Sequence, residues 1–146
     1  MNLRFTRGMN VLIRVAVALV GAGIILGNLP AQADDRKDIL GVWKGGMPGD
    51  PPGSIELTIT PEKISGRNPI TGKSLGVGTY AIDPNRKTID TRGMANPVQG
   101  NLYVGLYSIE GNTLKWVSNS RGRKRPVDLV HRPERDQFLM ILQRER

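Results

Sequence analysis

The chain has 146 residues, a formal net charge of +8, one histidine and no cysteine. The lack of cysteine excludes disulfide bonds and cysteine nucleophiles, and a single histidine cannot supply a histidine pair for a metal ion. Stability must therefore come from a hydrophobic core, which a chain of this length is large enough to form.

Residues 1–33 have the organisation of a secretory signal peptide. A basic start is followed by an apolar run over residues 15–29 and by the small-residue site Ala31-Gln32-Ala33. The run is about 15 residues long, shorter than the roughly 20 that a membrane-spanning helix needs. We therefore expect cleavage after Ala33 and export to the periplasm or the medium. The alternative is a retained N-terminal membrane anchor.

Cleavage would leave residues 34–146 as one domain. Because three arginines leave with the signal peptide, this domain has 18 basic and 13 acidic residues and a net charge of +5. Its first residues, 34–38, form a charged segment that can make one helical turn. No apolar run in this domain is long enough to cross a bilayer, so we expect no transmembrane segment after cleavage.

The rest of the domain alternates between short apolar segments and loops rich in glycine, proline, asparagine and aspartate. This pattern is typical of an all-β protein. The expected strands span residues 39–44, 54–60, 63–67, 77–82, 87–91, 102–109, 113–118 and 137–143, with a further short strand at 127–130. Loops are expected at residues 45–53, 68–76, 93–100 and 119–126.

The strongest local signal is a β-hairpin around Gly111-Asn112, a dipeptide that tolerates positive φ and is flanked by alternating apolar residues. With these two residues as the loop, Tyr107 faces Trp116 and Ile109 faces Leu114. The four side chains then share one face of the sheet, which we expect to be the inner face.

About eight strands joined by short links favour an antiparallel up-and-down sheet, because sequential strands tend to pair. Eight strands can also close into a barrel, which removes both sheet edges. Val104 and Leu106 would lie on the outer face of this barrel, where a loop or a partner would have to cover them.

Two ends of the domain resemble lipocalin and calycin barrels. Gly41-Val42-Trp43 resembles their Gly-x-Trp motif on the first strand, and Leu142-Gln143-Arg144 resembles their last strand, which closes with a basic residue. The ordered set from residues 78–80 through 89–90, 107–114 and 125–126 to 142–144 is similar to a lipocalin-like domain of unknown function, abundant in exported proteins of planctomycetes.

This resemblance covers nearly all of residues 34–146 and implies an eight-stranded antiparallel barrel. It also implies that Trp43 closes one end of the barrel beneath Arg144, with the guanidinium over the indole face. The family carries no established reaction. The domain is smaller than a typical lipocalin, so side chains alone could fill its interior.

Four aromatic residues are candidates for lining an apolar ligand pocket, because each combines an apolar ring with a polar atom. They are Trp43, Tyr80, Tyr107 and Trp116. The alternative is that they only pack the core.

A basic loop supplies the candidate anion contacts, which are Arg121, Arg123, Lys124 and Arg125. Four cations in five residues attract anions such as lipid head groups, acidic glycans or an acidic protein. No aromatic residues are interleaved with them, so we do not expect nucleic acid as a partner. The alternative is a solubilising loop that also prevents edge-to-edge strand pairing.

No residue pattern indicates an active site. His131 is expected in a solvated turn, Asp83 in the turn before Pro84, and Asp90 on the outer face of a strand, while residues 34–38 read as a solvated terminus. We therefore predict a non-enzymatic protein without metal or cofactor that binds a small apolar or amphipathic ligand. The alternative is a structural or protein-interaction module with a filled barrel that acts through its basic loop.

Overall fold

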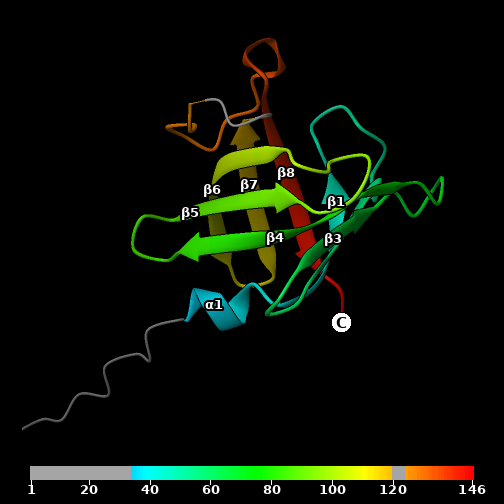
Figure 1. The fold of residues 1–146 in the computed structure, drawn as a ribbon. Helices are drawn as coiled ribbons and strands as arrows, with labels where there is room; N and C mark the ends of the chain where they lie inside the picture. Colours follow the sequence, from blue (N-terminus) through cyan, green and yellow to red (C-terminus); the bar gives the residue numbers. More distant parts are fainter. Residues whose placement is uncertain (1–33, 120–123) are drawn as a thin grey trace, which may run out of the picture. The chain divides into compact units, whose positions relative to one another are not determined.

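The computed structural model describes residues 34–119 and 124–146 (Figure 1). The predicted signal peptide and residues 120–123 of the basic loop lie outside the described residues. Among the described residues, no helix is both long and apolar enough to cross a bilayer.

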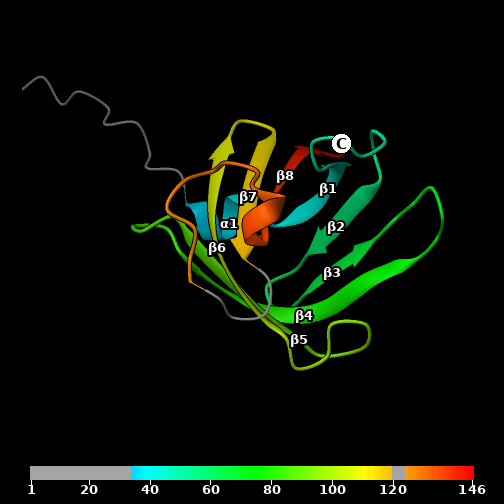
Figure 2. The same cartoon turned by 90° about the horizontal axis from the view of Figure 1, so that it is seen from above.

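Eight antiparallel strands form a closed barrel in which each strand pairs with the next and the last pairs with the first (Figures 1 and 2). The strands are β1 (Gly41–Gly46), β2 (Ile55–Ile59), β3 (Ile64–Arg67), β4 (Ser74–Asp83), β5 (Thr88–Gly93), β6 (Leu102–Glu110), β7 (Thr113–Asn119) and β8 (Gln137–Arg144). This confirms the predicted all-β, up-and-down barrel.

The two ends of the barrel differ. Because neighbouring strands run in opposite directions, β1, β3, β5 and β7 all finish at one end, and their long connections to the next strands lie there. We call this the long-loop end. Short turns and the helix α1 (Asp35–Asp38) lie at the other end, which we call the helix end (Figure 1).

The predicted hairpin is confirmed in register and in orientation. Tyr107 pairs with Trp116 and Ile109 with Leu114 across β6 and β7, and Gly111 supplies the positive φ of 58° in the turn. Tyr107, Leu114 and Trp116 are buried in the barrel core, and Ile109 packs against it. The alternation of side chains therefore identified the inner face correctly.

A second apolar layer lies outside the barrel. Leu106, Val117 and Leu139 are cross-strand neighbours on the outer faces of β6, β7 and β8, yet Val117 is fully buried. The connection before β8 covers this row: His131 Nδ1 accepts a hydrogen bond from the Leu139 amide at 3.1 Å. A loop therefore shields the outer face on which Leu106 was predicted to lie.

The predicted strand at 127–130 is wrong. This segment belongs to the connection that covers β8. It is held by hydrogen bonds of side chains and not by backbone hydrogen bonds to a neighbouring strand. Arg132 forms a bidentate pair with Asp128, and Gln137 Nε2 donates to the Val130 carbonyl at 2.6 Å. A short 3-10 helix, Pro133–Arg135, then leads into β8.

β4 begins earlier than predicted, inside the expected loop 68–76, because its glycines resemble turn residues in the sequence. In the structure they allow close packing. Gly76 has a φ of +125°, and a Cβ atom there would lie 2.4 Å from Val98 Cγ2. The connection from β5 to β6 folds back on this strand, with the Met94 amide donating to the Val77 carbonyl at 2.8 Å.

Candidate functional site

The helix end of the barrel is closed by Trp43. The indole is fully buried, and its Nε1 donates to the Ile39 carbonyl at 2.8 Å. The Arg144 guanidinium lies 4.2 Å from the ring centre and also donates to the Leu40 carbonyl at 2.7 Å and to the Asp38 carbonyl. The structure therefore brings Trp43 and Arg144 together and ties both to the end of α1.

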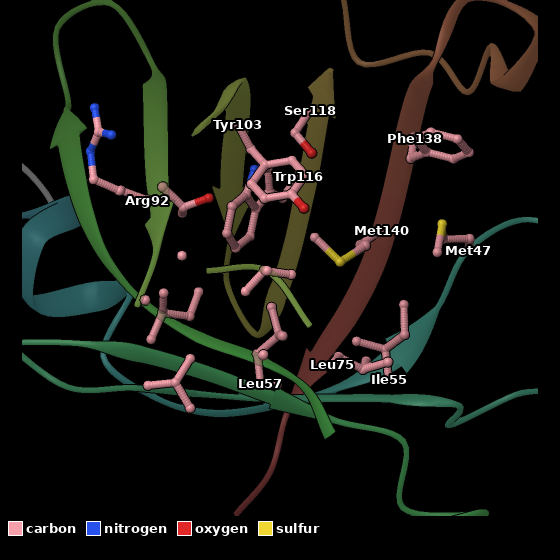
Figure 3. A pocket seen from close by; sticks show the side chains of 18 residues that line it. Met47, Ile55, Leu57, Leu75, Arg92, Tyr103, Trp116, Ser118, Phe138 and Met140 are labelled. Carbon is pink, nitrogen blue, oxygen red and sulfur yellow. The ribbon is translucent and has the colours of Figure 1, made fainter. Parts of the chain in front are cut away.

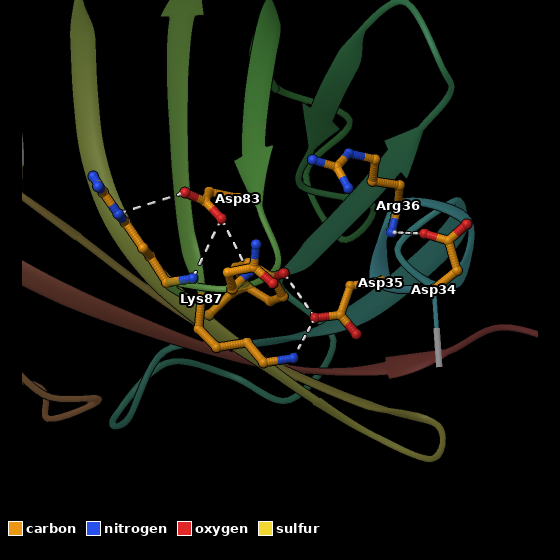
Figure 4. Close-up of polar contacts among 8 residues, drawn as sticks. Asp34, Asp35, Arg36, Asp83 and Lys87 are labelled. Atoms are coloured by element: carbon orange, nitrogen blue, oxygen red, sulfur yellow. Dashed lines mark hydrogen bonds and ion pairs between the residues drawn. The ribbon is translucent and has the colours of Figure 1, made fainter. Parts of the chain in front are cut away.

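Asp35 is part of this closure, although the sequence predicted a solvated terminus. Its side chain is only 6% exposed, and Oδ2 accepts from the Tyr107 hydroxyl at 2.7 Å and from Lys87 Nζ at 2.5 Å (Figure 4). Burial opposes ionisation, but the hydrogen bonds from Lys87 and Tyr107 outweigh it and lower the pKa of the Asp35 carboxyl. The prediction of a solvated Asp35 is wrong because Tyr107, 72 positions away in the chain, ends beside it.

Burial, together with the neighbouring Asp35 carboxylate, raises the pKa of the Tyr107 hydroxyl. Tyr107 therefore stays a hydrogen-bond donor at neutral pH. The hydrogen bonds of Asp35 with Tyr107 and Lys87 stabilise the attachment of α1 to the barrel.

The long-loop end contains a cavity of about 310 Å³. Small-molecule sites have volumes from about 300 Å³ upward. Most of the lining is apolar and comes from strands all around the barrel (Figure 3), including Met47, Ile55, Leu57, Leu75, Tyr103, Trp116, Phe138 and Met140. The interior is therefore filled at the helix end and hollow at the long-loop end.

Few polar groups face the cavity. The Tyr103 hydroxyl accepts from Asn101 Nδ2 at 3.1 Å, and Ser118 lies near the mouth. Trp116 Nε1 is buried without a hydrogen-bond partner among the described residues. The Arg92 guanidinium points away from the apolar side chains (Figure 3). This arrangement of apolar side chains with few polar groups suits an apolar molecule.

Of the four predicted lining aromatics, only Trp116 lines the cavity. Trp43 and Tyr107 pack at the helix end. Tyr80 lines a second, more polar pocket there, of about 390 Å³, and its hydroxyl donates to the Thr60 carbonyl at 2.8 Å. These positions follow from strand direction, because each of the three residues lies in the half of its strand nearer the helix end.

Four further residues that line the cavity were not predicted from the sequence. They are Tyr103, Phe138, Met47 and Met140. Tyr103 could have been found, because it lies four residues before Tyr107 and alternation places both on the inner face of β6. Phe138 and Met140 could have been predicted in the same way, because alternation places both on the same face of β8 as Leu142. Met47 follows the end of β1, in a loop without alternation, so no sequence signal identifies it.

The basic loop is only partly described. Arg121 and Arg123 lie outside the described residues, and Lys124 is exposed. Arg125 is not a free cation, because it forms a bidentate pair with Asp90, at 2.5 and 2.8 Å, and donates to the Gly105 carbonyl. The hydrogen bond with Asp90 raises the pKa of Arg125. Arg125 therefore attaches its loop to the outside of β5 and β6 instead of presenting a charge to an anion.

The remaining candidates are structural. Asp83 accepts from the Asn85 amide at 3.0 Å and is a turn residue, as predicted. His131 is half-buried and bonded to β8, so the prediction of a solvated turn is wrong. Among the described residues, no group of three His, Asp or Glu side chains could hold a metal ion.

Comparisons of the chain with protein-family models, with curated proteins and with solved structures found no match. The resemblance to the lipocalin-like domain of planctomycetes therefore stays a prediction. The functional argument rests on the geometry of the barrel, which is hollow at one end.

Proposed function

We propose that the protein binds a small apolar or amphipathic molecule in the cavity at the long-loop end. The observation that carries this proposal is the apolar cavity of about 310 Å³ above a core closed by Trp43. A cavity of this size counts against the alternative of a barrel filled by its own side chains. The predicted signal peptide supports action outside the cytoplasm.

The lining limits the chemistry of the ligand. No charged side chain among the described residues turns into the cavity, so the buried part of the ligand is uncharged. A polar end would stay at the mouth, near Ser118 and Tyr103. Each buried methylene contributes about 0.8 kcal/mol. A chain of about ten carbons therefore contributes about 8 kcal/mol, from which association costs of at least about 4 kcal/mol are subtracted.

A matched pair of substitutions tests the proposal. Ser118 lies on the inner face of β7 at the cavity, and Lys115 lies on the outer face of the same strand. Titration with a fluorescent fatty-acid analogue measures binding. We expect saturable, displaceable binding that Ser118→Trp weakens at least about tenfold by blocking the cavity, whereas Lys115→Trp leaves it unchanged. No displaceable binding, or equal binding by both variants, contradicts the proposal.

A further inference from the structure

Two adjacent loops at the long-loop end form an exposed apolar lip. The lip consists of residues 68–75, which include the first two residues of β4, and residues 92–98, which include the last two residues of β5. Ile70 is 62% exposed and Met94 is 57% exposed, although the described large apolar residues are mostly buried. The roots of the two loops lie close together, because a Cβ atom at Gly76 would lie 2.4 Å from Val98 Cγ2, and both loops project beyond the barrel (Figures 1 and 2).

The charge of the lip has one sign. Its two segments contain Lys73 and Arg92 but no Asp or Glu. Both cations are exposed, and neither forms an ion pair with a described residue. By contrast, Arg67 at the end of β3 is paired with Glu56 at 2.6 Å. The lip therefore combines protruding apolar side chains with unpaired positive charge.

The lip is continuous with the cavity. Leu75 lines the cavity and is also 37% exposed, so one side chain belongs to both surfaces. Figure 3 shows Leu75 beside Ile55 and Leu57 of the cavity wall. A surface that covered Ile70 and Met94 would lie directly over this side of the mouth.

We propose that the lip docks on the surface of a phospholipid bilayer that contains anionic lipids. Ile70 and Met94 enter the boundary between head groups and acyl chains, and Lys73 and Arg92 bind the lipid phosphates. Apolar side chains flanked by cations without acidic neighbours match the two chemical layers of such a surface. Docking brings the cavity mouth to the layer in which apolar molecules are dissolved.

Docking is independent of the proposed function, because it depends on the lip and not on the volume of the cavity. The two proposals can therefore fail separately. Titration of a soluble ligand without vesicles tests the cavity, and vesicle binding without added ligand tests the lip.

Single-cysteine labelling tests the orientation of docking, and the chain is suited to it because it contains no cysteine. The full-length sequence is expressed with Ile70→Cys, Met94→Cys or, as a control at the helix end, Asn85→Cys, and each protein carries an environment-sensitive fluorophore. We expect phosphatidylglycerol vesicles to shift the emission of the Ile70 and Met94 labels to the blue and to protect them from aqueous iodide. The Asn85 label should not respond.

Any of three results would overturn the proposal. They are no response at either lip position, a response of the Asn85 label equal to that of the lip labels, and an equal response to vesicles of pure phosphatidylcholine. The last result would show that the cations have no part in binding.

Charge reversal tests the cations directly. Each cation near an anionic surface contributes about fivefold to partitioning, so Lys73→Glu with Arg92→Glu should lower vesicle binding at least about twentyfold. Lys63→Glu with Arg86→Glu changes the net charge equally at the helix end and should have little effect. Equal losses in the two double variants would contradict docking through the lip, and high salt should weaken binding of the unaltered protein.

Discussion

Arg144 joins the last strand to the N-terminal helix through three contacts of one guanidinium group. It stacks on Trp43 and donates to two carbonyls near the end of α1. Both carbonyls belong to backbone that would otherwise end without hydrogen bonds at the base of the barrel. One side chain thus closes the core and satisfies the end of the helix.

Replacement of this guanidinium should be costly. Arg144→Met keeps the aliphatic cover over the indole but removes the charge-assisted hydrogen bonds, so we expect a loss of about 2–3 kcal/mol in the free energy of unfolding. Urea denaturation followed by tryptophan fluorescence measures it. Arg146→Met, at an exposed position, is the control and should be neutral. A loss below about 0.5 kcal/mol in Arg144→Met would contradict this role.

Asp35 predicts a pH dependence of stability. Its pKa is lower in the folded protein, so the stabilisation is complete above the pKa of the unfolded chain, near 4, and is lost as the pH falls through the folded pKa. Asp35→Asn should therefore cost about 2 kcal/mol at pH 7 and progressively less below about pH 4. Denaturant unfolding from pH 7 to pH 2 measures the difference.

Asp50→Asn, in an exposed loop, is the matched control and should change stability little at any pH. A difference between the unaltered protein and Asp35→Asn that stays constant from pH 7 to pH 2 would show that the carboxylate charge has no part in the effect.

At the scale of elements, the alternation of apolar and polar residues predicted the strands well, but it did not predict the conformation of the connections. The hairpin of β6 and β7 was predictable because its turn residues and its apolar alternation are local. The connection before β8 was not, because its conformation depends on groups distant in sequence. In the sequence, Arg125 belongs to a basic cluster. In the structure, it is paired with Asp90, which lies 35 residues earlier in the chain. Asp35 escaped prediction for the same reason.

The Arg125–Asp90 pair should hold this connection on the barrel. Both side chains are about one third exposed, so screening limits the contribution to about 1 kcal/mol. Asp90→Asn should therefore speed hydrogen exchange of the described amides between residues 124 and 132 by about fivefold. Glu56→Gln removes an exposed pair on another strand and should leave these amides unchanged. Unaltered exchange in Asp90→Asn would contradict the assignment.

At the scale of the whole molecule, closure of the barrel separates a stable base from a hollow mouth. The closed, all-β fold was predictable, because eight short alternating segments have few other ways to remove their edges. Which aromatics face the cavity was not predicted, because alternation gives the face of a residue but not its height in the barrel. The position of a residue along the barrel axis depends on where its strand begins and ends. The predicted start of β4 was too late, because the glycines inside this strand resemble turn residues.

Occupation of the cavity should stabilise the entire barrel. A ligand that binds only the folded protein adds about 2.7 kcal/mol at a concentration one hundred times its dissociation constant. A soluble apolar ligand should therefore raise the melting temperature of the unaltered protein but not that of Ser118→Trp. An equal rise in both proteins would place the binding elsewhere.

The pairing of β1 with β8 also affects how the polypeptide reaches its final form. A chain emerging from a ribosome cannot complete this ladder until residues 137–144 have been made. Before then, two strands expose unpaired backbone groups. If the predicted signal peptide directs export, late closure of the barrel would keep the newly made chain unfolded enough to be translocated.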